Sequence, residues 1–333
     1  MANPTYSIVI PVYNRPEEID ELLESLTHQT IKDFEVIIVE DGSTKRCEEV
    51  ITRYTNRLAI RYFFKENSGQ GFSRNFGFEK ANGEWLIVFD SDCLIPSDYL
   101  SKVDQYLKKH PLDAFGGPDR AAESFTVIQK AISFSMTSLL TTGGIRGSKA
   151  KVGTFHPRSF NMGIRRKVFE KTGGYILTRK GEDIEFSIRI AEHGFTVGLI
   201  PEAYVYHKRR TNFVQFFKQL HFFGTARINL GRYYPKEVRW VHCFPSVFLL
   251  GMIVLLYAYV QDKEWGIIGL RLYFLYFLII WVTATGRSEN FIVGLLSVVA
   301  SFVQLTAYGL GFLQEAAISL HDKLLPARAK QNA

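Results

Sequence analysis

The pattern of hydrophobic and polar residues divides this chain near residue 240. Before that point, short apolar runs alternate with segments in which apolar residues recur at helical spacing. The runs at residues 7–12, 34–39, 58–64 and 85–89 predict strands, and the segments at 16–26, 47–54, 71–80 and 97–109 predict helices. This alternation indicates an α/β fold of Rossmann-like type, with a mostly parallel sheet covered by helices on both faces.

After residue 240 come three long apolar stretches, at residues 241–260, 265–283 and 291–313. Each is close to the ~20 residues that cross ~30 Å of hydrocarbon, so we expect transmembrane helices, with buried core helices as the alternative. Gly309 and Gly311 break the third stretch, which leaves open whether it spans, tilts or re-enters. Three full spans would place the basic tail, with Lys323, Arg328 and Lys330, on the outside, against the positive-inside trend.

Much of the modest net charge of +7 clusters in front of the first apolar stretch. The basic residues there are Lys208, Arg209, Arg210, Lys218, Arg227, Arg232, Lys236 and Arg239. A positive flank beside a span is typical of the cytoplasmic side, and no groove-reading motif accompanies it, so we expect a membrane and no nucleic acid as partner. Two amphipathic segments, 125–140 and 213–227, are expected to lie in the membrane interface or to pack on the sheet.

The cysteines and the start of the chain indicate a reducing compartment. Cys47, Cys93 and Cys243 form no metal or disulfide pattern. The strand expected at residues 7–12 leaves no secretory signal in front of it. We therefore expect a globular unit at 1–210 on the cytoplasmic side, an interfacial segment at 211–240, a membrane region at 241–314 and a tail at 315–333.

Polar signals follow three of the expected strands, at the point where each strand ends. They are Tyr13-Asn14-Arg15-Pro16, Glu40-Asp41-Gly42-Ser43 and Asp90-Ser91-Asp92. Each alone could be an ordinary turn. Because ligands of parallel sheets bind at the carboxyl ends of the strands, three such signals indicate one shared crevice. Asp90 and Asp92 can both reach a hard divalent cation, which predicts a metal–diphosphate site.

A glycine-rich segment, residues 67–75, precedes one of the expected helices. Glycine lets the backbone approach a ligand closely, and a helix start favours anions. The segment lacks the Gly-Lys-Ser/Thr ending of a P-loop and the third glycine of a dinucleotide fingerprint.

These residues together resemble the family 2 glycosyltransferases with the GT-A fold. The resemblance covers residues 6 to about 210, and its motifs in chain order are Ile10-Pro11-Val12-Tyr13-Asn14-Arg15, Glu40-Asp41-Gly42-Ser43, Asn67-x-Gly69 with Arg74-Asn75, Asp90-x-Asp92, Asn161-Met162 with Arg165-Arg166, Gly173-Gly174-Tyr175 and Gly181-Glu182-Asp183. The order of the whole chain is similar to that of membrane-bound members that build bacterial exopolysaccharide and lipid-linked glycans.

The resemblance implies roles for these residues. A nucleotide-diphosphate sugar, with a UDP-sugar as the first expectation, and Mg²⁺ or Mn²⁺ would bind at the crevice. The residues implied on the donor side are Pro11, Tyr13, Arg15, Asp41, Ser43, Asn67, Arg74 and Asp90. Asp92 would ligate the metal with Asp90, and His207 would complete the site or be a structural histidine. Asp183 would be the catalytic base with Glu182 beside it, although both are also typical of a helix start.

The chain departs from the family pattern in two places, of which the first argues against a polymer-extruding synthase and the second is a mild change. The Gln-x-x-Arg-Trp motif of processive synthases is absent, because Gln219 is followed by Leu220-His221-Phe222-Phe223. Glu40 replaces the first aspartate of the usual Asp-Asp-Gly-Ser turn. We expect an inverting, metal-dependent glycosyltransferase that acts on a hydroxyl of a lipid-linked glycan acceptor. A polyprenyl-phosphate sugar synthase and a membrane protein that binds nucleotide-sugar without turnover are the alternatives.

Overall fold

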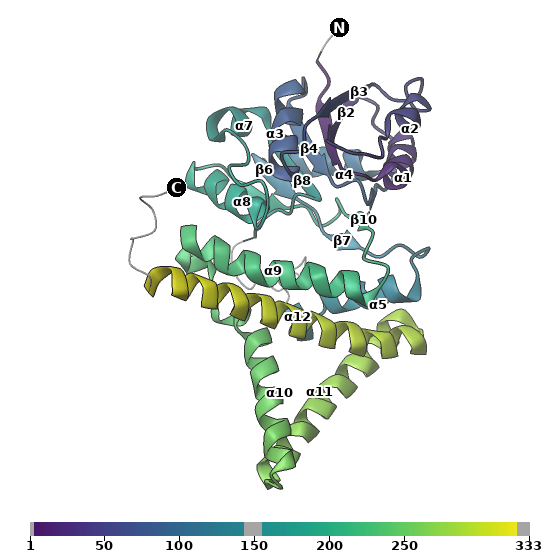
Figure 1. Cartoon of the computed structure of the whole chain (residues 1–333). Helices are drawn as coiled ribbons and strands as arrows, with labels where there is room; N and C mark the ends of the chain where they lie inside the picture. Colours follow the sequence, from purple (N-terminus) through teal and green to yellow (C-terminus); the bar gives the residue numbers. More distant parts are fainter. Residues whose placement is uncertain (1–2, 143–154, 325–333) are drawn as a thin grey trace. The chain divides into compact units, whose positions relative to one another are not determined.

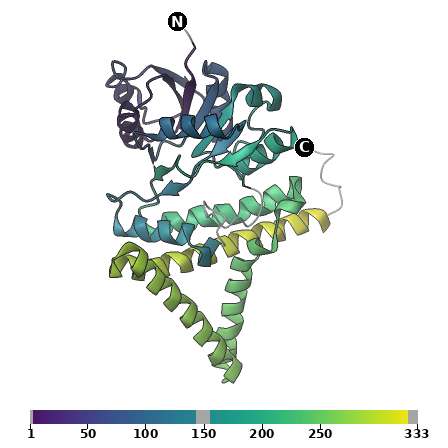
Figure 2. The ribbon, with the colours of Figure 1, turned by 180° about the vertical axis from the view of Figure 1, so that it is seen from behind.

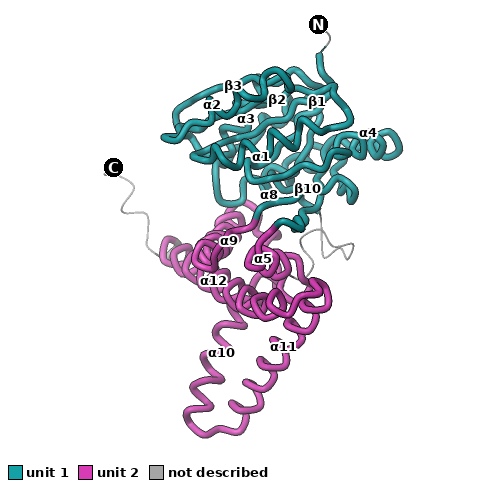
Figure 3. The backbone as a smooth tube through the Cα atoms, turned by 90° about the vertical axis from the view of Figure 1, so that its right-hand side faces the viewer, with its two compact units in different colours: residues 1–124, 146–208 teal, residues 125–145, 209–333 magenta. Residues whose placement is uncertain are grey.

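The structure is a computed structural model that describes residues 3–142 and 155–324. The chain forms two compact units, coloured separately in Figure 3. Unit 1 comprises residues 1–124 and 146–208, and unit 2 comprises residues 125–145 and 209–333. The segment that follows Ser124, expected either in the interface or on the sheet, therefore belongs with the C-terminal helices.

Unit 1 contains a seven-stranded sheet in the order β3-β2-β1-β4-β8-β6-β9 (Figure 1). Its strands are β1 Tyr6–Val12, β2 Phe34–Asp41, β3 Ile60–Lys65, β4 Trp85–Phe89, β6 Ala114–Gly116, β8 Asn161–Arg165 and β9 Val197–Leu199. The first four are parallel, with Tyr6 opposite both Phe34 and Trp85. Strand β8 is antiparallel to β4 and to β6. The predicted α/β fold with a mostly parallel sheet is confirmed.

Helices cover both faces of this sheet. Successive residues of a strand point to opposite faces, so Ile8 and Ile10 of β1 enter one core while Val9 enters the other. The first core includes side chains of α1 Pro16–Thr27, α2 Glu48–Thr52 and α4 Tyr99–Lys109. The second includes side chains of α3 Gln70–Lys80, α7 Arg166–Thr172 and α8 Glu182–Glu192. Strands buried on both faces explain the nearly continuous apolar runs in the sequence.

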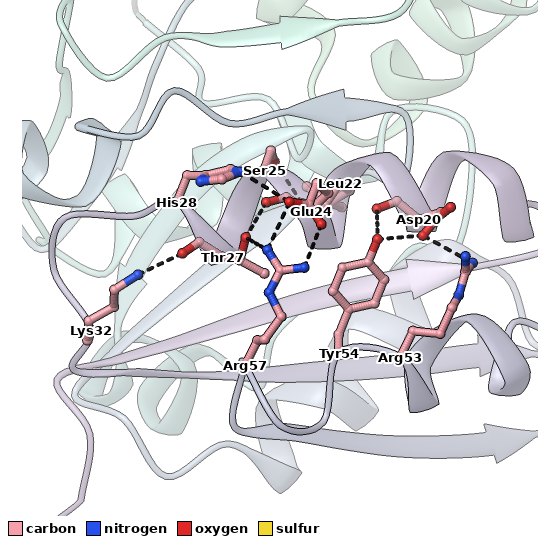
Figure 4. A network of polar contacts seen from close by, with 10 residues as sticks. All are labelled: Asp20, Leu22, Glu24, Ser25, Thr27, His28, Lys32, Arg53, Tyr54 and Arg57. Atoms are coloured by element: carbon pink, nitrogen blue, oxygen red, sulfur yellow. Dashed lines mark hydrogen bonds and ion pairs between the residues drawn. The ribbon is translucent and has the colours of Figure 1, made fainter.

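A polar network joins α1 to the segment that includes α2 (Figure 4). Arg57 contacts both carboxylate oxygens of Glu24, at 2.8 and 2.9 Å. Tyr54 donates its hydroxyl hydrogen to Asp20, which also pairs with Arg53 at 3.1 Å. Burial and the hydrogen bond to Asp20 raise the pKa of Tyr54 to about 12, so this donor stays protonated at physiological pH. The network fixes the helix that follows the first crevice loop.

A second, three-stranded sheet lies beside the carboxyl end of β4. It has the order β5-β10-β7, formed by β5 Cys93–Leu94, β10 Val205–His207 and β7 Asp119–Arg120. The antiparallel pairing of β10 with β5 sets His207 opposite Cys93. This short sheet was not predicted, and it brings residue 207 next to the Asp-x-Asp segment.

Unit 2 is entirely helical in its described residues (Figures 1 and 2). Its helices are α5 Val127–Thr137, α6 Leu139–Thr142, α9 Phe213–Tyr233, η1 Pro235–Glu237, η2 Trp240–His242, α10 Phe244–Val260, α11 Glu264–Ser288 and α12 Phe291–Leu324. Helices α5, α9 and α12 pack side by side, whereas α10 and α11 form a hairpin that projects from them. By length and composition alone, α11 and residues Phe291–Asp322 of α12 could each cross a membrane, and α10 is a shorter apolar helix.

The expected break in the third apolar stretch is wrong, because α12 continues through Gly309 and Gly311. A Cβ at Gly309 would lie 2.6 Å from the carbonyl oxygen of Pro245, and one at Gly311 would lie 2.1 Å from that of His221. These glycines therefore allow close contact between helices rather than ending the helix.

Candidate active site

The carboxyl ends of β1 and β2 are tied together by hydrogen bonds between their loops. Asn14, at φ 54°, donates its backbone N–H to Ser43 Oγ at 2.8 Å. Its side-chain oxygen accepts from the backbone N–H groups of Thr44 and Lys45, at 2.8 and 2.9 Å. The loop after each strand thus shapes the other, and the two loops lie together at the carboxyl ends of β1 and β2. Tyr13 projects from the first loop with 52% of its surface exposed, whereas Pro11 is partly buried.

Asp41 anchors the glycine-rich loop. Its carboxylate accepts from the backbone N–H groups of Ser68 and Gly69, each at 2.9 Å, and from Lys65. Asn67 adds a bond from its amide to the backbone oxygen of Asp41. Burial opposes ionisation, but the hydrogen bonds from Lys65 and Ser68 and the charge of Lys65 outweigh it and lower the pKa of Asp41. Both oxygens of Asp41 are engaged within the protein, so holding this loop is the function its contacts show.

Asp92 lies between two cationic or ionisable side chains. Arg15 from the first loop is 3.0 Å from its Oδ2, and His207 Nε2 from β10 is 3.0 Å from its Oδ1. The His207 ring stacks on Phe160 with centroids 4.8 Å apart, which fixes its plane. The structure therefore brings together Arg15, Asp92 and His207, three residues that lie far apart in the sequence.

The donor atoms around Asp92 suit a divalent metal. One ligand atom from each of Asp92, Cys93 and His207 can be chosen so that all lie within 4.8 Å of one another. Carboxylate oxygen suits Mg²⁺ and Mn²⁺, while an imidazole nitrogen and a thiolate are typical ligands of softer transition metals, so the set offers ligands for a divalent metal without selecting one. Asp90, expected as a second metal ligand, is not part of this group, and its Oδ1 pairs with Arg74 at 2.8 Å.

Arg74 is a buried connection between the end of β4 and the start of α8. Its side chain is 1% exposed and contacts Asp90 at 2.8 Å and Glu182 at 3.3 Å. Its guanidinium also lies 5.4 Å from the ring centre of Tyr175. Burial disfavours the cation, but the negative charges of Asp90 and Glu182 and the hydrogen bond to Asp90 outweigh burial and raise the pKa of Arg74. The guanidinium of Arg74 therefore holds two acids in place and is not exposed to a bound donor. This buried position was not expected from the place of Arg74 in the sequence.

Glu182 and Asp183 begin α8, as predicted, and their environments differ. Glu182 is 5% exposed and accepts from Gln70; burial and the charge of Asp183 raise its pKa against the opposing charge of Arg74. Asp183 pairs with Arg158 at 3.3 Å. Burial opposes its ionisation, but the charges of Arg158 and Arg74 prevail and lower the pKa of Asp183. Two adjacent acids whose pKa values are pushed apart are typical of an acid–base site.

Three residues that contact the expected site residues were not predicted. Lys65 ends β3, whose carboxyl end adjoins that of β2, so its position offered a weak signal. Gln70 begins α3 next to the glycine-rich loop, and its bond to Glu182 joins two segments far apart in the chain. Arg158 precedes β8 and belongs to no motif that the sequence reveals.

Comparisons with known proteins bear on the family and the fold of the chain. The family model described as Glycosyl transferase family 2 matches residues 7–173, half of the 333-residue chain. An uncharacterized glycosyltransferase of Haemophilus influenzae is 31% identical over 220 residues, which cover 62% of this chain and 70% of that protein. The validoxylamine A glucosyltransferase of Streptomyces hygroscopicus is 38% identical over 104 residues, 30% of this chain and 25% of its own length.

A solved structure shares the fold. The mannosyltransferase PcManGT from Pyrobaculum calidifontis, in complex with GDP-Man and Mn²⁺, matches with a TM-score of 0.67 at 18% identity. The match covers 97% of this chain and 89% of that protein. At this level of identity, the likeness establishes the fold of the polypeptide.

Proposed function

Because the chain belongs to glycosyl transferase family 2, we propose that it is an inverting, metal-dependent glycosyltransferase that moves one sugar from a nucleotide-diphosphate sugar to a hydroxyl of a membrane lipid-linked glycan. The observation that carries this proposal is the bridge through Arg74, which contacts both Asp90 and Glu182. Asp90 would lie on the donor side and Glu182 next to the base, so this buried cation would couple the bound diphosphate to the pair of acids that would activate the acceptor.

On the donor side, the exposed ring of Tyr13 would stack on the nucleoside, and Ser43 would line the same pocket. Arg15 would bind the diphosphate from its place beside Asp92. Asp92 and His207 would hold Mn²⁺ or Mg²⁺, with Asp90 nearby; when bound, the ion would neutralise charge on the leaving diphosphate. The GDP-Man and Mn²⁺ bound to the P. calidifontis mannosyltransferase support a donor and metal of this class.

On the acceptor side, Asp183 would take the proton of the attacking hydroxyl. Its lowered pKa keeps it ionised at neutral pH, whereas the raised pKa and burial of Glu182 suit a positioning role. Asp183→Asn keeps the shape and removes the basicity, so we expect turnover to fall by about 10²–10⁴, the usual contribution of general base catalysis, with little change in donor affinity. The measurement is nucleotide diphosphate released from a panel of donors, with Glu182→Gln as the matched variant. Loss of donor affinity with turnover near that of the wild type would place Asp183 in the donor site instead.

A polyprenyl-phosphate sugar synthase is the second candidate, and Arg158 is the observation that favours it. Its partly exposed guanidinium beside Asp183 could bind the phosphate of such an acceptor. A phosphate needs no base to attack, so in that case Asp183→Asn would keep most of its turnover and Arg158→Gln would lose it. Analysis of the lipid product separates a sugar phosphodiester from a glycosidic linkage.

The acceptor of this proposal does not leave the bilayer, so the enzyme would be bound to the cytoplasmic membrane with unit 1 in the cytoplasm, where nucleotide-sugars are made. The long apolar helices of unit 2 support this location. Retention of the full-length chain in membranes after carbonate washing would agree with it, and release would contradict it.

A further inference from the structure

We propose that unit 2 crosses the bilayer only through the α10–α11 hairpin, and that α12 lies along the membrane surface beside α9, so that its C-terminal end returns to the side from which α10 enters. Length and composition favour α11 and α12 as the spans. The packing of the helices favours α10 and α11 instead. This topology rests on the membrane association proposed above and adds a prediction that glycosyl transfer does not require.

The first observation is where α12 contacts the hairpin. A Cβ at Gly294 would lie 1.9 Å from Thr285 at the end of α11, and Ser246 at the start of α10 donates to the backbone oxygen of Gly309 at 3.2 Å. The two contact points are 15 residues apart on α12, or ~22 Å at 1.5 Å per residue. Helix α12 therefore joins the two open ends of the hairpin, as Figures 1 and 2 show.

A third span antiparallel to α11 would instead run back toward the hairpin's closed end. At that end the close contact lies within the hairpin, where a Cβ at Gly266 would be 2.6 Å from the backbone nitrogen of Tyr259. Gly309 lies at the opposite end, against Pro245. The direction of α12 is thus across the hairpin and not along it.

The second observation is that α12 follows α9 in the same direction. A Cβ at Gly224 would lie 2.2 Å from the backbone oxygen of Tyr308, and further along both helices Arg232 pairs with Glu315 at 3.0 Å. No apolar helix separates α9 from unit 1 in the chain, so α9 lies on the same side of the membrane as unit 1. Because the last turns of α12 pack beside α9, they lie on that side too.

The third observation is the reversed polarity of α12. Its buried residues include the polar side chains of Ser297, Ser301, Gln304 and Glu315, and Gln304 accepts from Ser135 of α5 at 2.6 Å. Its exposed residues include Phe291, Ile292, Leu295, Val299, Phe302 and Leu310. A surface helix in water has the opposite pattern, whereas small and polar residues between helices with apolar residues outside are typical of helices that face lipid.

The hairpin itself has the features of a crossing element. Its legs of 17 and 25 residues are ~26 and ~38 Å long, against ~30 Å of hydrocarbon. Aromatic side chains, which favour membrane interfaces, lie exposed at both ends: Trp240 at the open end and Tyr257, Tyr259 and Trp265 at the closed end. The turn at the closed end is polar, Gln261-Asp262-Lys263-Glu264, and charged groups are strongly disfavoured in hydrocarbon. This turn therefore has to reach the opposite surface.

Charge gives the direction. The open end carries Arg232, Lys236, Arg239 and Arg287, while the closed end has one basic and two acidic residues between Gln261 and Trp265. The positive-inside trend therefore assigns the open end to the cytoplasm. With the last described turns of α12 on this side, the conflict with the positive-inside trend that three spans create does not arise.

The test is labelling of single cysteines in the full-length chain with a membrane-impermeant maleimide. Cys47, Cys93 and Cys243 are first replaced, and the probes are Lys263→Cys at the closed end, Lys236→Cys at the open end and His321→Cys near the end of α12, all exposed positions. Glu49→Cys, exposed in unit 1, reports the side of that unit. We expect labelling at 263 only from outside intact cells, and labelling at 49, 236 and 321 only in inside-out vesicles.

Other outcomes overturn the proposal. Residue 321 on the same side as 263 would mean three spans. All four positions on one side would mean that the hairpin does not cross and covers another surface, such as a second copy of the chain. Either result would contradict the proposed topology without contradicting the proposed glycosyl transfer. Release of the protein by carbonate would instead contradict the membrane association on which both proposals depend.

Discussion

Replacing Arg74 by methionine tests whether buried charge, rather than crevice contact, defines the function of this residue. Methionine keeps much of the length of arginine and removes the cation. Asp90 is 33% exposed at its side chain and can be rehydrated, but the side chain of Glu182 is 6% exposed and would keep a buried, uncompensated carboxylate. Breaking a buried ion pair from one side destabilises a protein by about 3–5 kcal/mol, against ~0–1 kcal/mol for a surface pair.

The expected change is large enough for a melting experiment. For a unit of this size, 3–5 kcal/mol corresponds to a fall of ~6–20 °C in the midpoint. A maleimide dye that becomes fluorescent on reaction reports unfolding of unit 1, because Cys47 and Cys93 are both 0% exposed. Burial and the neighbouring Glu40 also raise the pKa of Cys47, which keeps the folded thiol unreactive. Cys243 is replaced by serine so that unit 2 gives no signal.

The defect also has a defined pH dependence. In the folded protein, burial and Asp183 already raise the pKa of Glu182, and loss of Arg74 raises it further. A raised carboxyl pKa means that the neutral form is favoured by folding, so the defect is present at neutral pH and shrinks as pH falls through the raised pKa. The double variant Arg74→Met with Glu182→Gln should recover most of the stability at neutral pH.

The matched control is Lys108→Met. Lys108 pairs with Asp104 at the surface, and its side chain is 73% exposed. This substitution should shift stability by less than about 1 kcal/mol. If Arg74→Met melts as high as this control, or if the double variant is no more stable than the single one, the reasoning from burial is refuted.

Two further variants test other contacts. Gly311→Leu should destabilise unit 2 by ~1–3 kcal/mol, because the larger side chain forces α9 and α12 apart. Its control is Gly286→Ala, which should be neutral or stabilising because nothing lies within 4 Å of the added Cβ. The fraction of protein that stays folded in detergent after heating measures both effects. Lys65→Met should raise the pKa of Asp41 in the folded protein. In the wild type, the lowered pKa of Asp41 contributes stability above the unfolded-state pKa, and this contribution is lost as the pH falls through the folded-state pKa. The melting midpoint of the variant should therefore begin to fall at a higher pH than that of the wild type. An unchanged pH profile would mean that the hydrogen bonds from Ser68, Gly69 and Ser73 hold this carboxylate ionised without Lys65.

The elements that the sequence predicted best are those determined locally. Residues 85–89 are uniformly apolar and form β4 with the predicted bounds, and α8 begins at Glu182 as predicted, preceded by Gly181 at φ 94°. The second sheet could not be predicted in this way, because strands of two or three residues such as Cys93–Leu94 and Val205–His207 carry no periodic signal. The neighbourhood of His207 was expected from the family resemblance, and the pairing of these strands is its structural cause.

The partners of the expected site residues depend on contacts between distant segments, which no local pattern reports. Arg158 meets Asp183 across 25 residues, and Gln70 meets Glu182 across 112. The direction of α12 is a similar case. An apolar helix that lies in a membrane surface and one that crosses it can have the same composition, so the proposed placement of α12 rests on contacts between distant segments, such as those of Gly294 and Gly309.

The buried polar residues of unit 1 serve both the fold and the candidate site, because the same side chains hold segments of the chain together and orient the groups of the site. Asp41 uses its carboxylate to hold the backbone of Ser68 and Gly69, and Arg74 uses its guanidinium to hold Asp90 and Glu182. The contacts of Asp41 and Asp90 join the end of a strand to a loop or helix from another part of the chain, and Arg74–Glu182 joins α3 to α8, so the site acquires its geometry only when these elements have assembled. A donor that binds there meets groups already oriented by the protein, and less binding energy is lost in ordering them. The charges of this crevice are therefore expected to stay in place when the donor leaves, with Arg15 and the ring of Tyr13, both less buried, as the parts that adjust.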